Sequence, residues 1–143
     1  MTNLVCDFQF KRLKQYCKRL GWNVVCKHNV ECSADFGLRI IVINSQLKPE
    51  IRLYRLLHEI GHILISHRKN YKQKFGCYDA SPKDLQKNIN KLCVVEEEFV
   101  AWDRGLQLAR KQNISINEAR FNKDKTQCLM SWVKWAAGNK TKQ

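Results

Sequence analysis

Apolar positions in the first third of the chain follow helical spacing and then strand spacing. Over residues 4–20 they recur every three or four residues, which predicts a helix that ends at Gly21. Its apolar face would consist of Leu4, Phe8, Leu13, Tyr16, Cys17 and Leu20. Runs rich in β-branched residues follow at 22–26 and 38–43, with a polar break between them. These runs predict two strands of a small sheet.

Helical spacing returns over residues 49–66 and predicts a helix with Pro49 in its first turn. The residues that would cover the sheet are Leu53, Leu56, Leu57, Ile60 and Leu64. Residues 68–88 are polar and predict an irregular connection, in which a short helix begins with Ser81 as N-cap and Pro82 as its first residue. A second long helix would then bury a stripe made of Leu92, Val95, Phe99, Trp102, Leu106 and Ala109.

A last helix is predicted over residues 125–137, where Gly138 ends it. Its buried side would consist of Leu129, Trp132, Val133 and Ala136. Together these elements predict an α+β fold, with a small β-sheet packed on helices. The length of 143 residues is that of one domain. We therefore expect a single domain over residues 1–143, with its core in 4–137 and a frayed tail at 138–143.

The helix predicted over residues 49–66 contains the pattern H-E-x-x-H, with His58, Glu59 and His62. Four-residue spacing puts the two histidines on one face, about 6 Å apart along the helix axis, so both can bind one cation. Glu59 lies about 100° round the helix from His58, close enough to act on a water at the metal without being a ligand. The pattern predicts a Zn2+ site with His58 and His62 as ligands and Glu59 as the catalytic base. The alternative is a solvated or core-capping histidine pair.

A catalytic zinc usually takes three protein ligands and leaves a fourth position open. The chain offers three carboxylates in a row about 35 residues later: Glu96, Glu97 and Glu98. Helical spacing puts Glu98 on an arc of small residues with Ala101 and Gly105, which would let this helix approach Gly61 closely. We predict Glu98 as the third ligand, with Glu97 as the alternative and Glu96 on the solvent side. Three adjacent glutamates on a solvated face are the remaining possibility.

Three stretches of the chain carry a family resemblance: residues 40–44, 56–64 and 98–102. Together they resemble the ImmA/IrrE type of zinc metallopeptidase and, more closely, small H-E-x-x-H proteins found in bacteriophages. The resemblance covers roughly residues 35–110. It implies a minimal zincin-like fold, with zinc on His58, His62 and Glu98 and with Glu59 as general base. Trp102 stands where that family usually has asparagine.

Basic side chains outnumber acidic ones by 26 to 13, which gives a net charge of +13. A charge of this size favours an acidic partner or nucleic acid. The basic residues are scattered along the chain, so a solvated surface without a specific partner is the alternative. Their densest group consists of Lys11, Arg12, Lys14, Lys18 and Arg19.

The seven cysteines are an odd number and form no Cys-x-x-Cys pair. We expect them to be reduced thiols rather than disulfides or a second zinc site. The first ten residues have no apolar core of signal-peptide length, and no apolar run reaches the roughly 20 residues that a transmembrane helix needs. These features predict a soluble cytoplasmic protein without membrane contact.

The function predicted from the sequence is that of a zinc-dependent metallopeptidase that acts on a protein or peptide. The alternative is a basic protein of phage type that binds nucleic acid or a host protein and in which zinc is structural. Two further polar residues, His67 and Tyr78, could lie near the site. His67 is expected to be a surface histidine, and Tyr78 is a candidate for stabilising an oxyanion.

Overall fold

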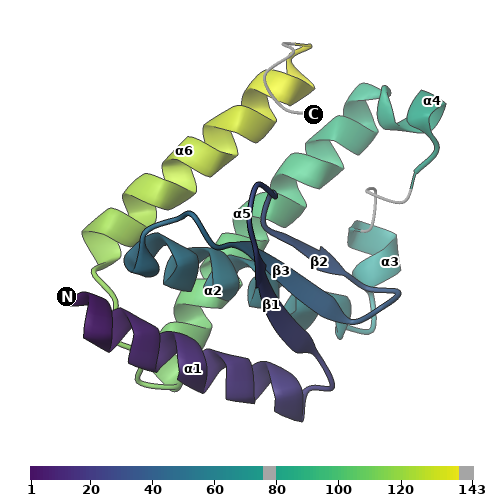
Figure 1. The fold of residues 1–143 in the computed structure, drawn as a ribbon. Helices are drawn as coiled ribbons and strands as arrows, with labels where there is room; N and C mark the ends of the chain where they lie inside the picture. Colours follow the sequence, from purple (N-terminus) through teal and green to yellow (C-terminus); the bar gives the residue numbers. More distant parts are fainter. Residues whose placement is uncertain (76–79, 139–143) are drawn as a thin grey trace.

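A computed structural model of the protein describes residues 1–75 and 80–138 (Figure 1). Within these ranges the chain is α+β, as predicted. The elements in chain order are α1 (Asn3–Arg19), β1 (Asn23–Lys27), β2 (Ser33–Asp35), β3 (Ile40–Asn44), α2 (Pro49–Ser66), α3 (Tyr71–Lys74), α4 (Pro82–Leu85), α5 (Asn88–Lys111) and α6 (Glu118–Ala136). None of the described helices is both long and apolar enough to cross a bilayer.

The three strands form a sheet in the order β1-β3-β2. β3 pairs in parallel with β1 and antiparallel with β2, so that Ile41 lies beside Val24 on one side and Ala34 on the other. Burial alternates along β3, with Ile41 and Ile43 inside, because successive side chains point to opposite faces. The short strand β2 was not predicted. Its three residues carry no apolar alternation, and only their pairing with β3 makes them a strand.

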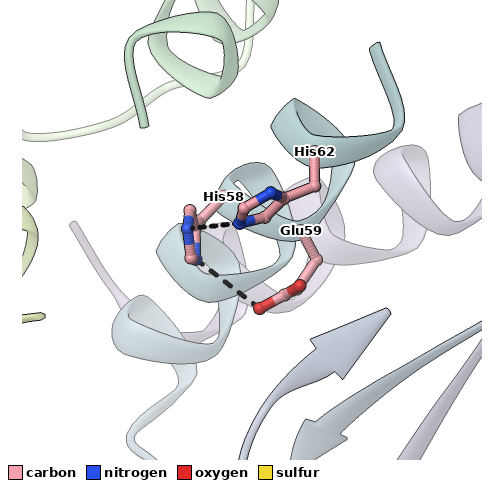
Figure 2. Close-up of side chains that lie close together, drawn as sticks. All are labelled: His58, Glu59 and His62. Carbon is pink, nitrogen blue, oxygen red and sulfur yellow. Dashed lines mark hydrogen bonds and ion pairs between the residues drawn. The ribbon is translucent and has the colours of Figure 1, made fainter. Parts of the chain in front are cut away.

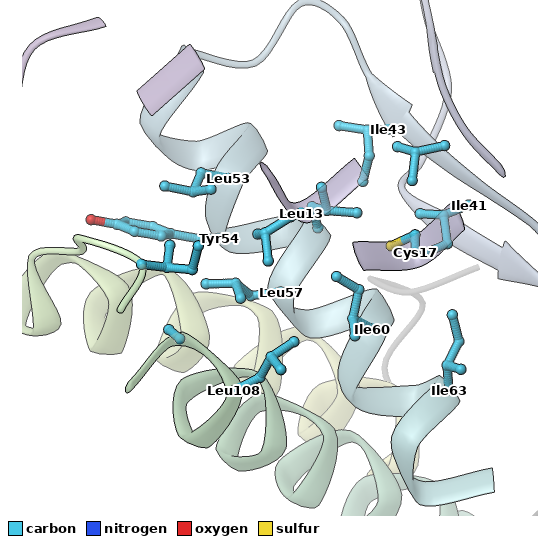
Figure 3. Packing of buried hydrophobic residues seen from close by; sticks show 14 of the residues in the cluster. Leu13, Cys17, Ile41, Ile43, Leu53, Tyr54, Leu57, Ile60, Ile63 and Leu108 are labelled. Carbon is cyan, nitrogen blue, oxygen red and sulfur yellow. The ribbon is translucent and has the colours of Figure 1, made fainter. Parts of the chain in front are cut away.

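Helix α2 lies at the centre of the molecule and has the bounds predicted from the sequence. One side packs on β3 and on α1, through a cluster that includes Leu57, Ile60, Ile43, Leu13 and Cys17 (Figure 3). Apolar side chains of this size each contribute about 1.5–3 kcal/mol when fully buried. The opposite side of α2 carries the histidines and packs on α5.

Two glycines bring α2 and α5 together. A Cβ atom on Gly61 of α2 would overlap the backbone carbonyl of Ala101 on α5. A Cβ atom on Gly105 of α5 would lie 2.6 Å from the carbonyl oxygen of Leu57 on α2. The helix backbones therefore touch at both positions, and the close approach predicted at Gly61 is confirmed.

The apolar faces predicted for α1 and α5 were partly wrong. On α1, Leu4 and Phe8 are 80% and 60% exposed, and the helix instead buries Cys6 and Gln9 beside Leu13 and Cys17. On α5, Leu92 and Phe99 are exposed. Trp102 and Ala109 of the predicted stripe are buried. The other buried residues of α5 lie beside the stripe and are Val94, Glu97, Glu98, Ala101, Gly105 and Leu108. Small and acidic residues make up much of this buried face. The spacing of apolar residues alone therefore does not predict it fully.

Helix α6 begins at Glu118, seven residues before the predicted start. The side chain of Asn117 caps it by accepting from the backbone N–H of Arg120, which satisfies an otherwise unpaired donor. Of the predicted buried side, Val133 is 44% exposed. The buried residues of α6 are Phe121 and Asp124, in its first half. Asp124 accepts two hydrogen bonds from Arg55 of α2, both 2.9 Å long, and this pair attaches α6 to the central helix.

Gly61→Ala is expected to destabilise the protein, although alanine favours an isolated helix by about 1 kcal/mol. The new methyl group would meet the Ala101 backbone, which cannot move away as a side chain can. We expect a net loss of about 1–3 kcal/mol in the free energy of unfolding, measured by urea denaturation of the metal-free protein. The exposed Gln107→Ala on α5 is the control and should change it by less than about 0.5 kcal/mol. Equal stability of Gly61→Ala and the original chain would show that the helices do not touch here.

Candidate metal centre

His58 and His62 lie one turn apart on α2 and turn the same nitrogen toward each other. Their Nε2 atoms are 3.1 Å apart, and Figure 2 shows both rings on the same side of the helix. Glu98 of α5 contacts both of these atoms. One carboxylate oxygen lies 2.8 Å from Nε2 of His58, and the other lies 3.5 Å from Nε2 of His62. The close contact of α2 and α5 therefore brings two imidazoles and a carboxylate to one point.

The donor atoms at this point fit a zinc ion. Bonds of about 2.0–2.1 Å in a tetrahedral site place neighbouring ligand atoms about 3.3–3.4 Å apart. Here the two Nε2 atoms are 3.1 Å apart, and the two oxygens of the Glu98 carboxylate lie 2.8 Å from the first and 3.5 Å from the second. The carboxylates of Glu59, Glu97 and Glu98 are all buried at this place. Because buried carboxylates need compensating positive charge, the surroundings also favour a cation.

A proton on His62 supplies part of that positive charge. Burial opposes protonation of His62, but hydrogen bonding with Glu97 and Glu98 and the nearby carboxylate charges outweigh it and raise the pKa of His62 to about 10. Burial alone would raise the pKa of Glu98, whereas its contacts with His58 and His62 lower that pKa well below the usual range. Glu98 is therefore ionised and faces a protonated imidazole.

Glu59 is buried beside His58. One of its oxygens lies 3.5 Å from Nδ1 of His58, on the ring edge opposite Nε2 (Figure 2). One oxygen of Glu59 and one ring nitrogen from each histidine all lie within 4.8 Å of one another. A carboxylate at this distance can reach a water next to the two histidines, since a bridging water spans about 5–6 Å between its two partners.

The three consecutive glutamates of α5 have three different surroundings. Glu96 is exposed, as predicted. Glu98 contacts Nε2 of both histidines. Glu97, the alternative ligand, is buried and lies 3.4 Å from Nδ1 of His62, on the other edge of that ring.

Trp102 lies next to the histidines, although the sequence predicts it only as part of the apolar stripe and of the stretch that carries the family resemblance. Its indole stacks on the His58 imidazole, with the ring centroids 4.5 Å apart and the planes 10° from parallel. The indole also packs edge to face with the ring of Phe121 on α6. Its buried N–H has no acceptor within the described part of the chain, so ring packing holds the indole in place. Trp102 is four residues after Glu98 and so lies on the same face of α5 as Glu98. This spacing indicates from sequence that Trp102 lies near the histidines.

Of the two further candidate residues, His67 is exposed at the end of α2, as expected. Tyr78 lies outside the described residues.

A helix-borne H-E-x-x-H pair that meets a carboxylate from a second helix is a candidate site of the metallopeptidase type. Comparison with protein families agrees with this class. Residues 17–122 match the Peptidase_M78 family, described as the IrrE N-terminal-like domain, and the chain belongs to this family. The matched segment runs from the end of α1 to the first turns of α6. No curated protein and no solved structure matches the chain.

Zinc binding to the metal-free protein is expected to release protons. With a pKa of about 10, His62 is protonated at neutral pH, and an imidazole must lose its proton before it binds a metal. The apparent affinity for zinc should therefore rise with pH, by about tenfold per unit for each proton released. Calorimetric titrations at about pH 6.5 and about pH 7.5, in buffers of different ionisation enthalpy, measure the affinity and the protons together. An affinity that does not change with pH would contradict the protonated state.

Proposed function

We propose that this protein is a zinc-dependent peptidase in which His58, His62 and Glu98 hold the metal and Glu59 is the general base. The observation that carries the proposal is the meeting of two Nε2 atoms and one carboxylate within 3.5 Å of each other, at the contact of α2 and α5. Membership of a peptidase family supports the class of reaction.

The donor set favours zinc over the other common divalent ions. Two imidazole nitrogens and one carboxylate oxygen suit zinc, whereas calcium and magnesium prefer sites made of oxygen ligands. Three protein ligands are also the number found in catalytic zinc sites, since the fourth position is needed by the reactants. Zinc at this place would supply the Lewis acidity that polarises a carbonyl group and favours ionisation of a water.

Glu59 would transfer the proton of the reaction. Its carboxylate accepts a proton from water while the water oxygen forms a bond to the carbonyl carbon of the substrate. The protonated side chain then donates this proton to the amide nitrogen as the carbon–nitrogen bond breaks, so the amine leaves neutral. One of its oxygens lies within 4.8 Å of a ring nitrogen of each histidine, which supports its reach to a water bound there.

Glu59→Gln is expected to keep the metal and lose the reaction. The amide has nearly the same shape but cannot accept the proton, so peptide hydrolysis should fall by about 10²-fold or more. His58→Ala should lose the zinc itself. Zinc per chain, measured by atomic emission, and cleavage of a synthetic peptide library, measured by mass spectrometry, separate the two effects.

The control for both variants is the exposed neighbour Glu96, changed to Gln, which should preserve zinc and cleavage. Cleavage by Glu59→Gln at the original rate would refute the general base. Zinc retained by His58→Ala would refute the metal site.

We propose an acidic partner as a second property of the protein, which rests on its net charge of +13. Lys11, Lys14 and Lys18 are exposed on α1 and favour such a partner on this face. In this role the protein would bind a polyanion or an acidic host protein whether or not it cleaves a substrate. The odd number of cysteines supports a reducing compartment such as the cytoplasm.

Binding to a short DNA duplex is expected to weaken as salt rises, because basic side chains release counterions from the phosphates. Changing Lys11, Lys14 and Lys18 together to Glu should weaken binding and reduce the slope of log affinity against log salt by up to about 3. Fluorescence anisotropy at several salt concentrations measures this slope, and unchanged zinc content is the control. Affinity that is independent of salt would exclude this mode of binding.

A further inference from the structure

The two histidines of the site have the same orientation. Each points Nε2 toward the other and toward Glu98, and each has a different buried carboxylate near Nδ1. A neutral imidazole that gives the Nε2 lone pair to a metal carries its hydrogen on Nδ1. Because both rings lie almost wholly inside the protein, these N–H groups need acceptors.

Glu97 is placed to be the acceptor for His62. Its carboxylate oxygen lies 3.4 Å from Nδ1 of His62, and the residue is only 2% exposed. Consecutive residues of a helix point about 100° apart, so Glu97 and Glu98 reach different edges of the same ring. Glu98 reaches the Nε2 edge and Glu97 reaches the Nδ1 edge.

We propose that Glu97 is a positioning residue, which holds His62 from Nδ1, and that it is not a metal ligand. This inference rests on the proposed zinc site. A carboxylate behind a metal-binding histidine fixes its tautomer and ring orientation and makes the ligand nitrogen more basic. The role also explains why two neighbouring glutamates of α5 are buried together despite their mutual repulsion, since each has its own edge of the imidazole.

The ring geometry argues against Glu97 as the third ligand. The two Nε2 atoms and Glu98 already meet at one point, and Nδ1 of His62, on the other side of the Cε1 carbon, makes its hydrogen bond in a different direction. If Glu97 were to bind a metal at Nε2, it would have to exchange places with Glu98. The structure therefore separates the two glutamates that helical spacing alone left as alternatives.

The test compares Glu97→Leu, Glu97→Gln and Glu98→Gln with the original chain and with the exposed control Glu96→Gln. Zinc affinity is measured by competition with a chelator, and the ligand set is measured from the absorption spectrum of the cobalt-substituted protein. Glu97→Leu should weaken zinc binding about 10- to 100-fold, with one metal per chain and an unchanged cobalt spectrum. Glu97→Gln should recover much of the affinity, because its side-chain oxygen can still accept the Nδ1 hydrogen.

The nitrogen-15 NMR chemical shifts of the imidazoles provide a second test. They would not change if Glu97 only supported the fold without contacting Nδ1 of His62. In the zinc-loaded original chain, His62 should carry its hydrogen on Nδ1, and the resonance of this nitrogen should shift in Glu97→Gln. This variant differs little in shape, so it keeps the test valid even if Glu97→Leu fails to fold.

The possible outcomes are distinguishable. A changed cobalt spectrum in Glu97→Gln, with a loss of affinity as large as that of Glu98→Gln, would make Glu97 a ligand and overturn the inference. Original zinc affinity in both Glu97 variants would also overturn it while leaving the zinc site intact. An original chain that binds no zinc would overturn the proposed function and this inference with it.

Discussion

Helices α2 and α5 meet backbone to backbone because Gly61 lies against Ala101 and Gly105 lies against Leu57. The contact sets the distance between the histidines on one helix and the glutamates on the other. A helix pair held apart by larger side chains has its axes 8–10 Å apart or more, and a glutamate would then have to bridge a wider gap. The sheet and α1 support this contact from behind, since they bury the other side of α2.

The contact has an electrostatic consequence. It encloses the carboxylates of Glu59, Glu97 and Glu98 around the imidazoles of His58 and His62. The raised pKa of His62, about 10, keeps a proton there that balances part of this charge. A divalent cation bound at this place would replace that proton, so metal binding would be coupled to proton release. The indole stacked on His58 keeps one side of the site apolar, which strengthens the interactions between charges inside it.

Much of the site followed from local sequence. The spacing of His58 and His62 requires only a helix, and Pro49 with the apolar period up to Ser66 predicted that helix with its observed bounds. Gly61 in a helix interior indicated a close neighbour, and the small residues after Glu98 indicated which helix it is. These predictions succeeded because the residue types report directly on helix geometry and on steric space.

The remaining features depend on contacts between distant parts of the chain. The inner face of α5 consists largely of small and charged residues that packing against other helices, mainly α2, makes buried, so the hydrophobic pattern identified only part of it. Strand β2 exists through its pairing with β3. Glu97 and Glu98 contact different nitrogens of the His62 ring, and the spacing along α5 contains no information about which nitrogen each one reaches.

We propose that α2 and α5 together bind one zinc ion at the Nε2 atoms of His58 and His62 and the carboxylate of Glu98. Anomalous X-ray diffraction at the zinc absorption edge, from crystals of the protein purified with zinc, locates such an ion directly. We expect one strong anomalous peak within about 2.0–2.2 Å of these three donors. The absence of a peak at this point, or a peak coordinated by Glu97 in place of Glu98, would contradict it.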